Sequence, residues 1–165
     1  MQEAVVIDCL RTAVGKSPRG ALRTTRPDDM AAAVMRALLG RHPQVPGEEI
    51  DDVILGCATP EAESGMNMAR IAAMPAGLPD MIPGVTINRF CSSGLQAIAM
   101  AGDRVRAGGA QIILAGGSES MSLLPMAGRK IAPNPWLVDH KPEIYINMGL
   151  TAEAVQQKFR ISRED

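Results

Sequence analysis

Short apolar runs rich in β-branched residues recur along the chain before residue 120, and each is bounded by Gly, Pro or polar residues. They cover 4–7, 53–55, 85–87 and 112–115. Runs of this length between turn-forming residues are typical of buried strands. We therefore predict four strands in this part of the chain.

Between these runs the apolar residues follow helical spacing. One set is Met30, Ala33, Val34, Ala37 and Leu38, and a later one is Leu95, Ile98, Ala99, Gly102 and Val105. A less regular helix is predicted over 67–76 and a last one over 151–160. Asp28 or Asp29 is suited to cap the first helix, and Ser92 or Ser93 the third. This alternation of strands and helices predicts an α/β fold with a mostly parallel sheet.

The pattern breaks down after Ser122, where Pro and Gly recur too often for long regular elements. We predict that 121–147 forms a long excursion over the sheet, and such stretches are commonly substrate-covering loops. The expected division is a domain over 1–120 and a loop-domain portion over 121–165. Because 162–165 has the composition of a helix cap and first turn, we expect the sequence to stop within a domain.

Charge and composition exclude several classes of partner. Seventeen basic and eighteen acidic residues give a net charge of -1, and 46% of residues are hydrophobic. Such a balance provides no general attraction for nucleic acid, and four scattered aromatic residues form no platform for stacking bases. No apolar run is long enough for a membrane span and no leader pattern opens the chain, so a cytoplasmic, folded protein is expected.

The three cysteines differ in position. Cys9 and Cys57 fall at the ends of the first two predicted strands, where core packing is expected. Their spacing fits neither a disulfide framework nor a metal site, so no metal is predicted. A segment at 15–17, Gly-Lys-Ser, is similar to a phosphate-binding loop, but Leu10 stands where that motif needs Gly. A surface loop is therefore predicted there.

Cys91 lies where a predicted strand passes directly into a predicted helix. The free N–H groups and dipole at a helix amino terminus stabilise a thiolate, the form that attacks a carbonyl. The same N–H groups suit the oxygen of a tetrahedral intermediate, and Ser93 and Gly94 leave room for an acyl group. Cys91 is thus a candidate nucleophile. The alternative is a small buried thiol without chemistry.

The segment 88–97, Asn-Arg-Phe-Cys-Ser-Ser-Gly-Leu-Gln-Ala, resembles the active-site segment of thiolases, the acetyl-CoA acyltransferases. Arg-Thr-Ala-Val-Gly-Lys at 11–16 is similar to the family's entry into its first loop, and Ala-Gly-Gly-Ser-Glu-Ser-Met-Ser at 115–122 to its turn after the fourth strand. The stretch at 148–153, followed by Ile-Ser-Arg-Glu at 161–164, resembles the end of its loop domain. The resemblance covers essentially the whole chain.

The resemblance implies a layered αβαβα enzyme of two similar halves, of which this chain supplies the first half and most of the loop domain. It implies that Cys91 takes an acyl group from a 3-ketoacyl-CoA, releases acetyl-CoA and passes the shortened acyl chain to a second CoA, reversibly. CoA is then a substrate, and no metal or prosthetic group is needed. By the same resemblance, Met148 lines the channel for the pantetheine arm. A homodimer or homotetramer and a place in lipid metabolism, including fatty-acid β-oxidation, are also implied.

The family's general base and acid lie, by resemblance, in downstream Gly-His-Pro and Cys-x-Gly motifs that these 165 residues do not contain. His42 and His140 are not expected to be catalytic. One alternative is therefore a truncated, non-catalytic fragment or an interaction module. Another is a condensing enzyme that acts on carrier-protein thioesters. Acyl-chain length and the working direction of the reaction are left open.

Overall fold

The computed structural model describes residues 3–165, and the chain forms two compact units that divide between Arg129 and Lys130. Each unit is described by itself. Residues 121–129 belong to the first unit. Within this segment Leu124 is buried, and the Arg129 N–H donates to a Glu61 carboxylate oxygen at 2.7 Å. The family domains 1–120 and 121–165 stay a prediction, since compact units need not coincide with family domains.

The first unit is built on three parallel strands, β1 (Asp52–Gly56), β2 (Gly84–Ile87) and β3 (Ile113–Gly117). Their order is β2-β1-β3, so β1 is central, with Ile54 opposite Val85 on one side and Ala115 on the other. The predicted runs at 53–55, 85–87 and 112–115 are confirmed as strands. All three point the same way, so their carboxyl ends meet at one edge of the sheet.

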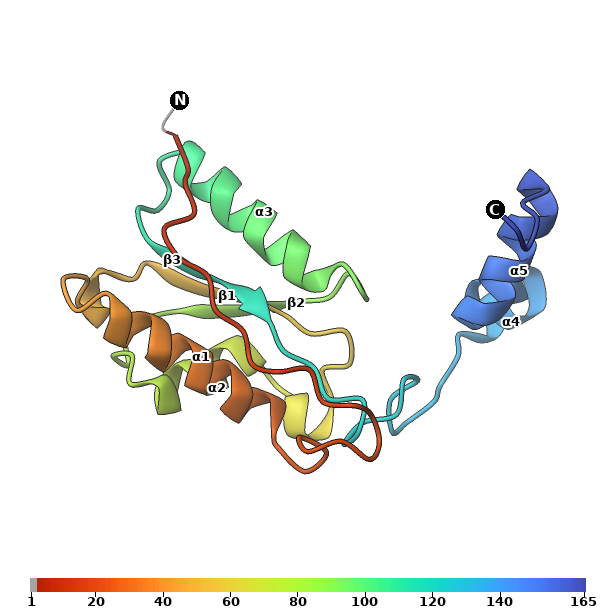
Figure 1. Ribbon diagram of the computed structural model, residues 1–165, viewed down its shortest axis with the longest axis horizontal. Helices are drawn as coiled ribbons and strands as arrows, with labels where there is room; N and C mark the ends of the chain where they lie inside the picture. Colours follow the sequence, from red (N-terminus) through yellow and green to blue (C-terminus); the bar gives the residue numbers. More distant parts are fainter. Residues whose placement is uncertain (1–2) are drawn as a thin grey trace. The chain divides into compact units, whose positions relative to one another are not determined.

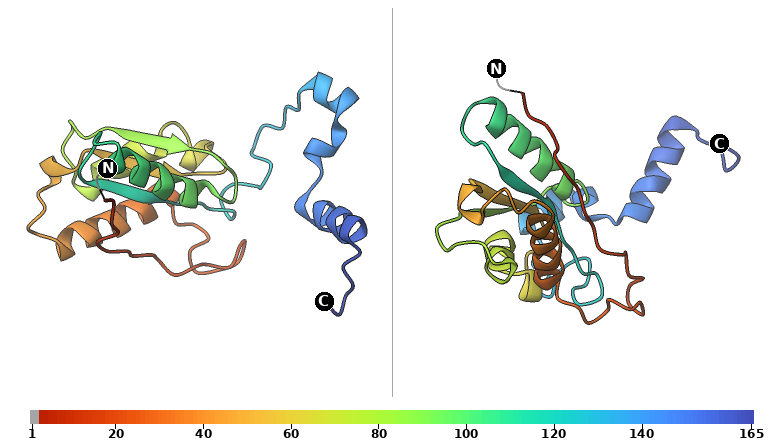
Figure 2. Two further views of the ribbon diagram at one scale, coloured as in Figure 1. Left: turned by 90° about the horizontal axis from the view of Figure 1, so that it is seen from above. Right: turned by 60° about the vertical axis from the view of Figure 1, so that its left-hand side comes forward.

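Three helices cover the two faces of this sheet (Figure 1). They are α1 (Pro27–Arg41), α2 (Met68–Ala76) and α3 (Ser93–Arg106), and short 3₁₀ turns lie at Gly47–Glu49 and Ala62–Ser64. The right-hand view of Figure 2 shows α3 and α1 on opposite sides of β3. The predicted α/β alternation is confirmed for these elements.

Side-chain alternation along β1 decides what each face buries. Val53, Leu55 and Cys57 face α1 and α2, where they join the larger core cluster, whereas Ile54 faces α3. The α1/α2 cluster also contains Ala31, Ala32, Met35, Ile50, Met68, Ala69, Ala72, Ala73, Ala76, Leu78 and Ile82. The buried apolar cluster on the α3 face consists of Ile54, Ala97 and Ala101. Most of the apolar core therefore lies on one side of the sheet.

The prediction of a strand at 4–7 is wrong in this structure. The segment is irregular, and Val5, Val6 and Ile7 are 72%, 76% and 71% exposed. Asp8 ties it to the end of α1, because its carboxylate accepts a hydrogen bond from His42 Nε2 at 2.8 Å. An apolar, β-branched run encodes an extended backbone but not the neighbour that a strand needs, and no strand among residues 3–165 pairs with it.

The predicted helix caps are also corrected. The helix α1 begins at Pro27, whose fixed φ suits the first helical position, and Arg26 occupies the N-cap without a side-chain cap. Asp28 instead is buried and accepts hydrogen bonds from the Arg26 guanidinium. Ser92 is the N-cap residue of α3, but its side chain makes no cap hydrogen bond.

The second unit contains α4 (Pro135–His140), a 3₁₀ turn (Pro142–Tyr145) and α5 (Met148–Phe159). The helix α4 lies inside 121–147, which was predicted to be irregular. The side chains of Asn134 and Asn147 cap the two α-helices by accepting from the N–H groups three residues on. No described residue of these three elements is buried. Across residues 3–165, no helix combines the length and apolarity that crossing a membrane requires.

Candidate functional site

The candidate site is the turn that joins β2 to α3, residues 88–93, which we call the Cys91 turn. It lies at the carboxyl end of β2, and Cys91 is exposed. The residue before it, Phe90, has a φ of 46°, in the left-handed region that residues with a Cβ seldom adopt. Such conformations persist only where neighbouring groups hold them, and they are common at functional sites.

Two side chains of the turn hold this conformation from within. The Ser93 hydroxyl donates to the Phe90 carbonyl at 2.6 Å and accepts from the Arg89 N–H at 2.8 Å. The Asn88 side-chain oxygen accepts from the Phe90 N–H, also at 2.8 Å. The predicted role of Ser93 as a cap is therefore replaced by a role in shaping the loop that precedes the helix.

Close backbone packing seats the turn against the sheet. A Cβ on Gly56, the last residue of β1, would lie 2.3 Å from the carbonyl carbon of Ser93. A Cβ on Gly117, the last residue of β3, would lie 2.9 Å from the Gly56 oxygen and 3.4 Å from the Gly94 Cα. Side chains at 56 and 117 would push α3 away. Glycines at both strand ends thus bring the start of α3 directly onto the sheet.

The start of α3 offers free hydrogen-bond donors beside the thiol. Gln96 is the first α3 residue whose N–H bonds to the backbone four positions earlier, at Ser92. The N–H groups of Gly94 and Leu95 make no hydrogen bond to any of residues 3–165. Together with the dipole of this 14-residue helix, they favour negative charge that develops near the turn, such as an oxyanion.

The other two cysteines have different surroundings. Cys57 is buried, and burial together with the nearby Glu119 carboxylate raises the pKa of its thiol to about 11. It is therefore protonated at neutral pH, and its predicted role in core packing is confirmed. Cys9 is exposed on the irregular segment before Leu10, so the same prediction is wrong for Cys9.

Each of the two histidines is hydrogen-bonded to a residue of its own unit. His42 Nε2 bonds to Asp8, and this bond together with Arg41 holds the pKa of the Asp8 carboxyl below its usual value. His140 Nδ1 bonds to the Trp136 carbonyl at 2.8 Å, and its ring stacks on that indole. The expectation that neither histidine is catalytic stays a prediction. The described residues contain no cluster of His, Cys, Asp and Glu that could hold a metal.

Met148 is the first residue of α5, in the second unit, and is 66% exposed. Its backbone follows the N-cap Asn147, whose side chain fixes the first turn of the helix. An exposed thioether at a helix start is available for an apolar ligand.

The sequence pattern does not single out Glu119 or Asn88 as site residues. Glu119 accepts from the Ala58 N–H at 2.6 Å and lies 3.8 Å from the Cys57 sulfur. Asn88 donates to the Ala58 carbonyl at 3.0 Å. Both follow strand ends, where polar side chains of a parallel sheet converge, and this position is the feature that could have identified them.

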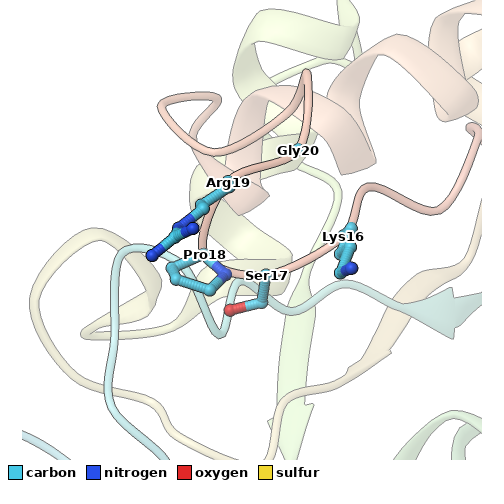
Figure 3. A pocket seen from close by; sticks show the side chains of 5 residues that line it. All are labelled: Lys16, Ser17, Pro18, Arg19 and Gly20. Atoms are coloured by element: carbon cyan, nitrogen blue, oxygen red, sulfur yellow. The ribbon is translucent and has the colours of Figure 1, made fainter.

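A surface cavity of about 370 Å³ is lined by residues of a single loop, Lys16, Ser17, Pro18, Arg19 and Gly20. In Figure 3 the side chains of Lys16 and Arg19 point apart, so they do not converge on one ligand position. Ser17 donates its hydroxyl hydrogen to the Met121 carbonyl at 2.9 Å. Within residues 3–165, no hydrogen bond joins this loop to the Cys91 turn.

Comparison with known proteins adds independent information. The family described as the thiolase N-terminal domain matches residues 4–165. A 3-ketoacyl-CoA thiolase of Bacillus subtilis is 50% identical over 165 residues, which are 100% of this chain and 42% of that protein. One of Idiomarina loihiensis is 40% identical over 99% of the chain and again 42% of the relative. The chain thus spans less than half the length of these relatives.

A solved structure gives the same result for the fold. The acetyl-CoA acetyltransferase of Bacillus anthracis superimposes with a TM-score of 0.69 at 35% identity, covering 88% of this chain and 39% of that one. The predicted fold class, a thiolase-like α/β fold with a parallel sheet, is confirmed by this similarity and by the three parallel strands.

Proposed function

Because the chain belongs to the thiolase N-terminal domain family, we propose that it forms the nucleophile-bearing part of a 3-ketoacyl-CoA thiolase. The family that the four sequence motifs indicate is confirmed by the match over residues 4–165. The observation that carries the functional proposal is the position of Cys91, exposed in a constrained turn beside the free N–H groups of Gly94 and Leu95.

In the proposed reaction the Cys91 thiolate attacks the C3 carbonyl carbon of a 3-ketoacyl-CoA. The bond between C2 and C3 breaks, its electron pair stays on C2, and C2 takes a proton to give acetyl-CoA. The thiolate of a second CoA then attacks the Cys91 thioester, forms the shortened acyl-CoA and releases the Cys91 thiolate. Free N–H groups at the start of α3 would stabilise the oxyanion of each addition step.

Proton transfer in this scheme needs an acid and a base other than His42 and His140. Both histidines are bonded elsewhere, to Asp8 and to Trp136. Cys57 is unsuited to be the acid that supplies C2, because its pKa of about 11 and its burial keep its proton in place. We therefore propose that none of these three side chains carries the proton transfers.

We further propose that Met148 contacts the pantetheine arm of CoA and that the protein assembles as a homodimer or homotetramer. The exposed thioether of Met148 supports the first proposal. For the second, β2 and β3 are the outer strands of the sheet in residues 3–165, and free strand edges pair readily with another chain. Light scattering after size-exclusion chromatography measures the number of copies.

Acyl transfer to Cys91 is the direct test. The chain is incubated with acetyl-CoA at pH 7, quenched in acid, digested and analysed by peptide mass spectrometry. We expect an acetyl group on Cys91 and its loss in Cys91→Ser. Cys9→Ser is the matched control, because Cys9 is also exposed but does not precede a helix. Equal acetylation of Cys9 and Cys91 in the wild type would contradict the proposal.

A second candidate function is a non-catalytic interaction module. The outer face of α3 favours it, since Leu95 and Ile98 are 72% and 48% exposed. Exposed apolar side chains on one helix face are typical of surfaces that bind another polypeptide. A folded chain that never acetylates on Cys91 would favour this function over acyl transfer.

A further inference from the structure

Ala58, just beyond the end of β1, is held by side chains from both neighbouring strand ends. Its N–H donates to Glu119 Oε2 at 2.6 Å, and its carbonyl accepts from Asn88 Nδ2 at 3.0 Å. Glu119 follows β3 and Asn88 follows β2. The carboxyl ends of all three strands are therefore tied together through one peptide segment.

The connection continues into the Cys91 turn. The second polar atom of the Asn88 side chain, Oδ1, accepts from the Phe90 N–H at 2.8 Å. Phe90 adopts the unfavourable φ of 46° and immediately precedes Cys91. A continuous path thus runs from Glu119 through Ala58 and Asn88 to the strained residue. Hydrogen bonds of this Asn type commonly stabilise such turns.

We infer that Asn88 and Glu119 form a clamp that holds the Cys91 turn in the shape that presents the thiol at the start of α3. Both are positioning residues, because neither is itself the nucleophile. Glu119 fixes Ala58, Ala58 orients the Asn88 amide, and the Asn88 oxygen holds Phe90. The inference rests on the proposed function for the reaction it serves, whereas the contacts themselves are independent of it.

Each half of the clamp uses a distinct chemical property. Asn88 needs both an acceptor and a donor, because Oδ1 serves Phe90 and Nδ2 serves Ala58. Glu119 needs acceptors only, and its charge strengthens the bond to the Ala58 N–H. Asn88→Asp therefore keeps an acceptor for Phe90 but loses the donor to Ala58. Glu119→Gln keeps an oxygen for Ala58 but loses the charge.

The test measures thiol reactivity rather than turnover. The full 165-residue chain is labelled with iodoacetamide at pH 7, and the labelling rate of Cys91 is divided by that of the exposed Cys9 in the same sample. Labelling of buried Cys57 reports whether each variant stays folded. Asn67→Ala is the matched control, because Asn67 also bonds with both side-chain atoms, to the Gly84 carbonyl and the Arg70 N–H.

Asn88→Ala loses the bonds to both Ala58 and Phe90. We expect it to lower the Cys91 to Cys9 ratio about three- to tenfold, the size expected when the bond that holds Phe90 is lost. Asn88→Asp should lower the ratio less than Asn88→Ala does, although it too is less stable than the wild type, because it keeps the acceptor for Phe90 but loses the donor to Ala58 that orients it. If Asn88 had a purely structural role, the labelling ratio and the free energy of unfolding would fall together in both variants. Asn67→Ala should lower stability and leave the ratio unchanged.

An unchanged ratio in folded Asn88→Ala, or an equal fall in Asn67→Ala, would overturn the clamp. If Asn88→Ala exposes Cys57 to label, Glu119→Gln decides in its place, since a lower ratio supports the clamp and an unchanged one rejects it. Acetyl-CoA on the same samples separates the two proposals. If the labelling ratio depends on the clamp but Cys91 is not acetylated, only the proposed function is rejected. If Cys91 is acetylated to the same extent in Asn88→Ala as in the wild type, only the clamp is rejected.

Discussion

The two faces of the sheet are stabilised in different ways. The α1/α2 face buries a continuous cluster of fourteen residues, from Ala31 to Ile82. The α3 face buries three apolar residues, Ile54, Ala97 and Ala101, and the backbone lies close to the sheet at Gly56 and Gly117. Hydrophobic stabilisation is roughly proportional to the apolar area buried, so most of it comes from the α1/α2 face. The second face carries the candidate nucleophile.

This difference suggests a division of roles within one small unit. The large apolar core of the α1/α2 face offsets the cost of local backbone strain elsewhere in the unit. Phe90, in its left-handed conformation, lies on the α3 face, which has the smaller core. Substitutions on the α1/α2 face should therefore change stability more than Cys91 reactivity. Substitutions at the contact between α3 and the sheet should change both.

The largest effect is expected from Gly56→Ala. The new Cβ would lie 2.3 Å from the Ser93 carbonyl carbon and 2.5 Å from the Gly94 nitrogen, and backbone atoms cannot rotate away. We expect the free energy of unfolding to fall by about 4 kcal/mol, above the usual cost of overpacking. The Cys91 labelling ratio should fall as α3 shifts. Urea titration and thiol labelling measure both, and a variant with wild-type stability and labelling would contradict the proposed contact.

The next largest effect is expected from Met68→Ala on the opposite face. Met68 is 1% exposed inside the α1/α2 cluster, so its truncation should lower the free energy of unfolding by about 3 kcal/mol. Below the unfolding transition, the Cys91 labelling ratio should stay unchanged. Met81→Ala is the control, because Met81 is 75% exposed and should lose little. A fall in the labelling ratio of folded Met68→Ala would show that the two faces are not separable.

A smaller effect should appear at high pH through Cys57. Burial raises the pKa of its thiol from 9.0 to about 11, so the unfolded chain ionises first as the pH rises. The folded state is therefore fully stabilised below pH 9 and loses about 2 kcal/mol as the pH passes from 9 to 11. Urea titrations of the wild type and Cys57→Ser isolate this loss, because the hydroxyl does not titrate. Parallel stability curves over this range would argue against the shift.

Much of the first unit could be predicted from local pattern, and its exceptions have physical causes. The strands at 53–55, 85–87 and 112–115 could be predicted because short β-branched runs between turns are typical of strands. The segment 4–7 has the same pattern but no strand partner among residues 3–165. A strand is defined by its neighbour, which no local pattern contains. The helix start at Pro27 was missed because Asp28 resembles a cap in sequence, whereas its carboxylate bonds to Arg26.

The site, like the fold, could be predicted only where its residues are close together in sequence. Cys91 could be identified because the strand, turn and helix that surround it are consecutive in sequence. Asn88 and Glu119 could not, because their bonds to Ala58 join positions 30 and 61 residues apart. Gly56 was missed for the same reason, since the atoms that exclude a side chain there belong to Ser93 and Gly94. Contacts between strand ends depend on the order of the sheet, which the hydrophobic pattern leaves open.

The smallest effect, and the one of opposite sign, is expected from Gly102→Ala. Gly102 lies within α3 like Gly94, but a Cβ there meets no described atom within 4 Å. Alanine restricts the unfolded chain and favours helix, so the free energy of unfolding should rise by about 1 kcal/mol. Because the start of α3 is untouched, the Cys91 labelling ratio should stay at its wild-type value. Gly56→Ala and Gly102→Ala thus add the same methyl group, one against the start of α3 and the other where no described atom lies within 4 Å, and urea titration of both variants compares them directly. Only the position that faces the backbone of the Cys91 turn should lose stability, and a loss in Gly102→Ala would mean that α3 also packs closely away from its start.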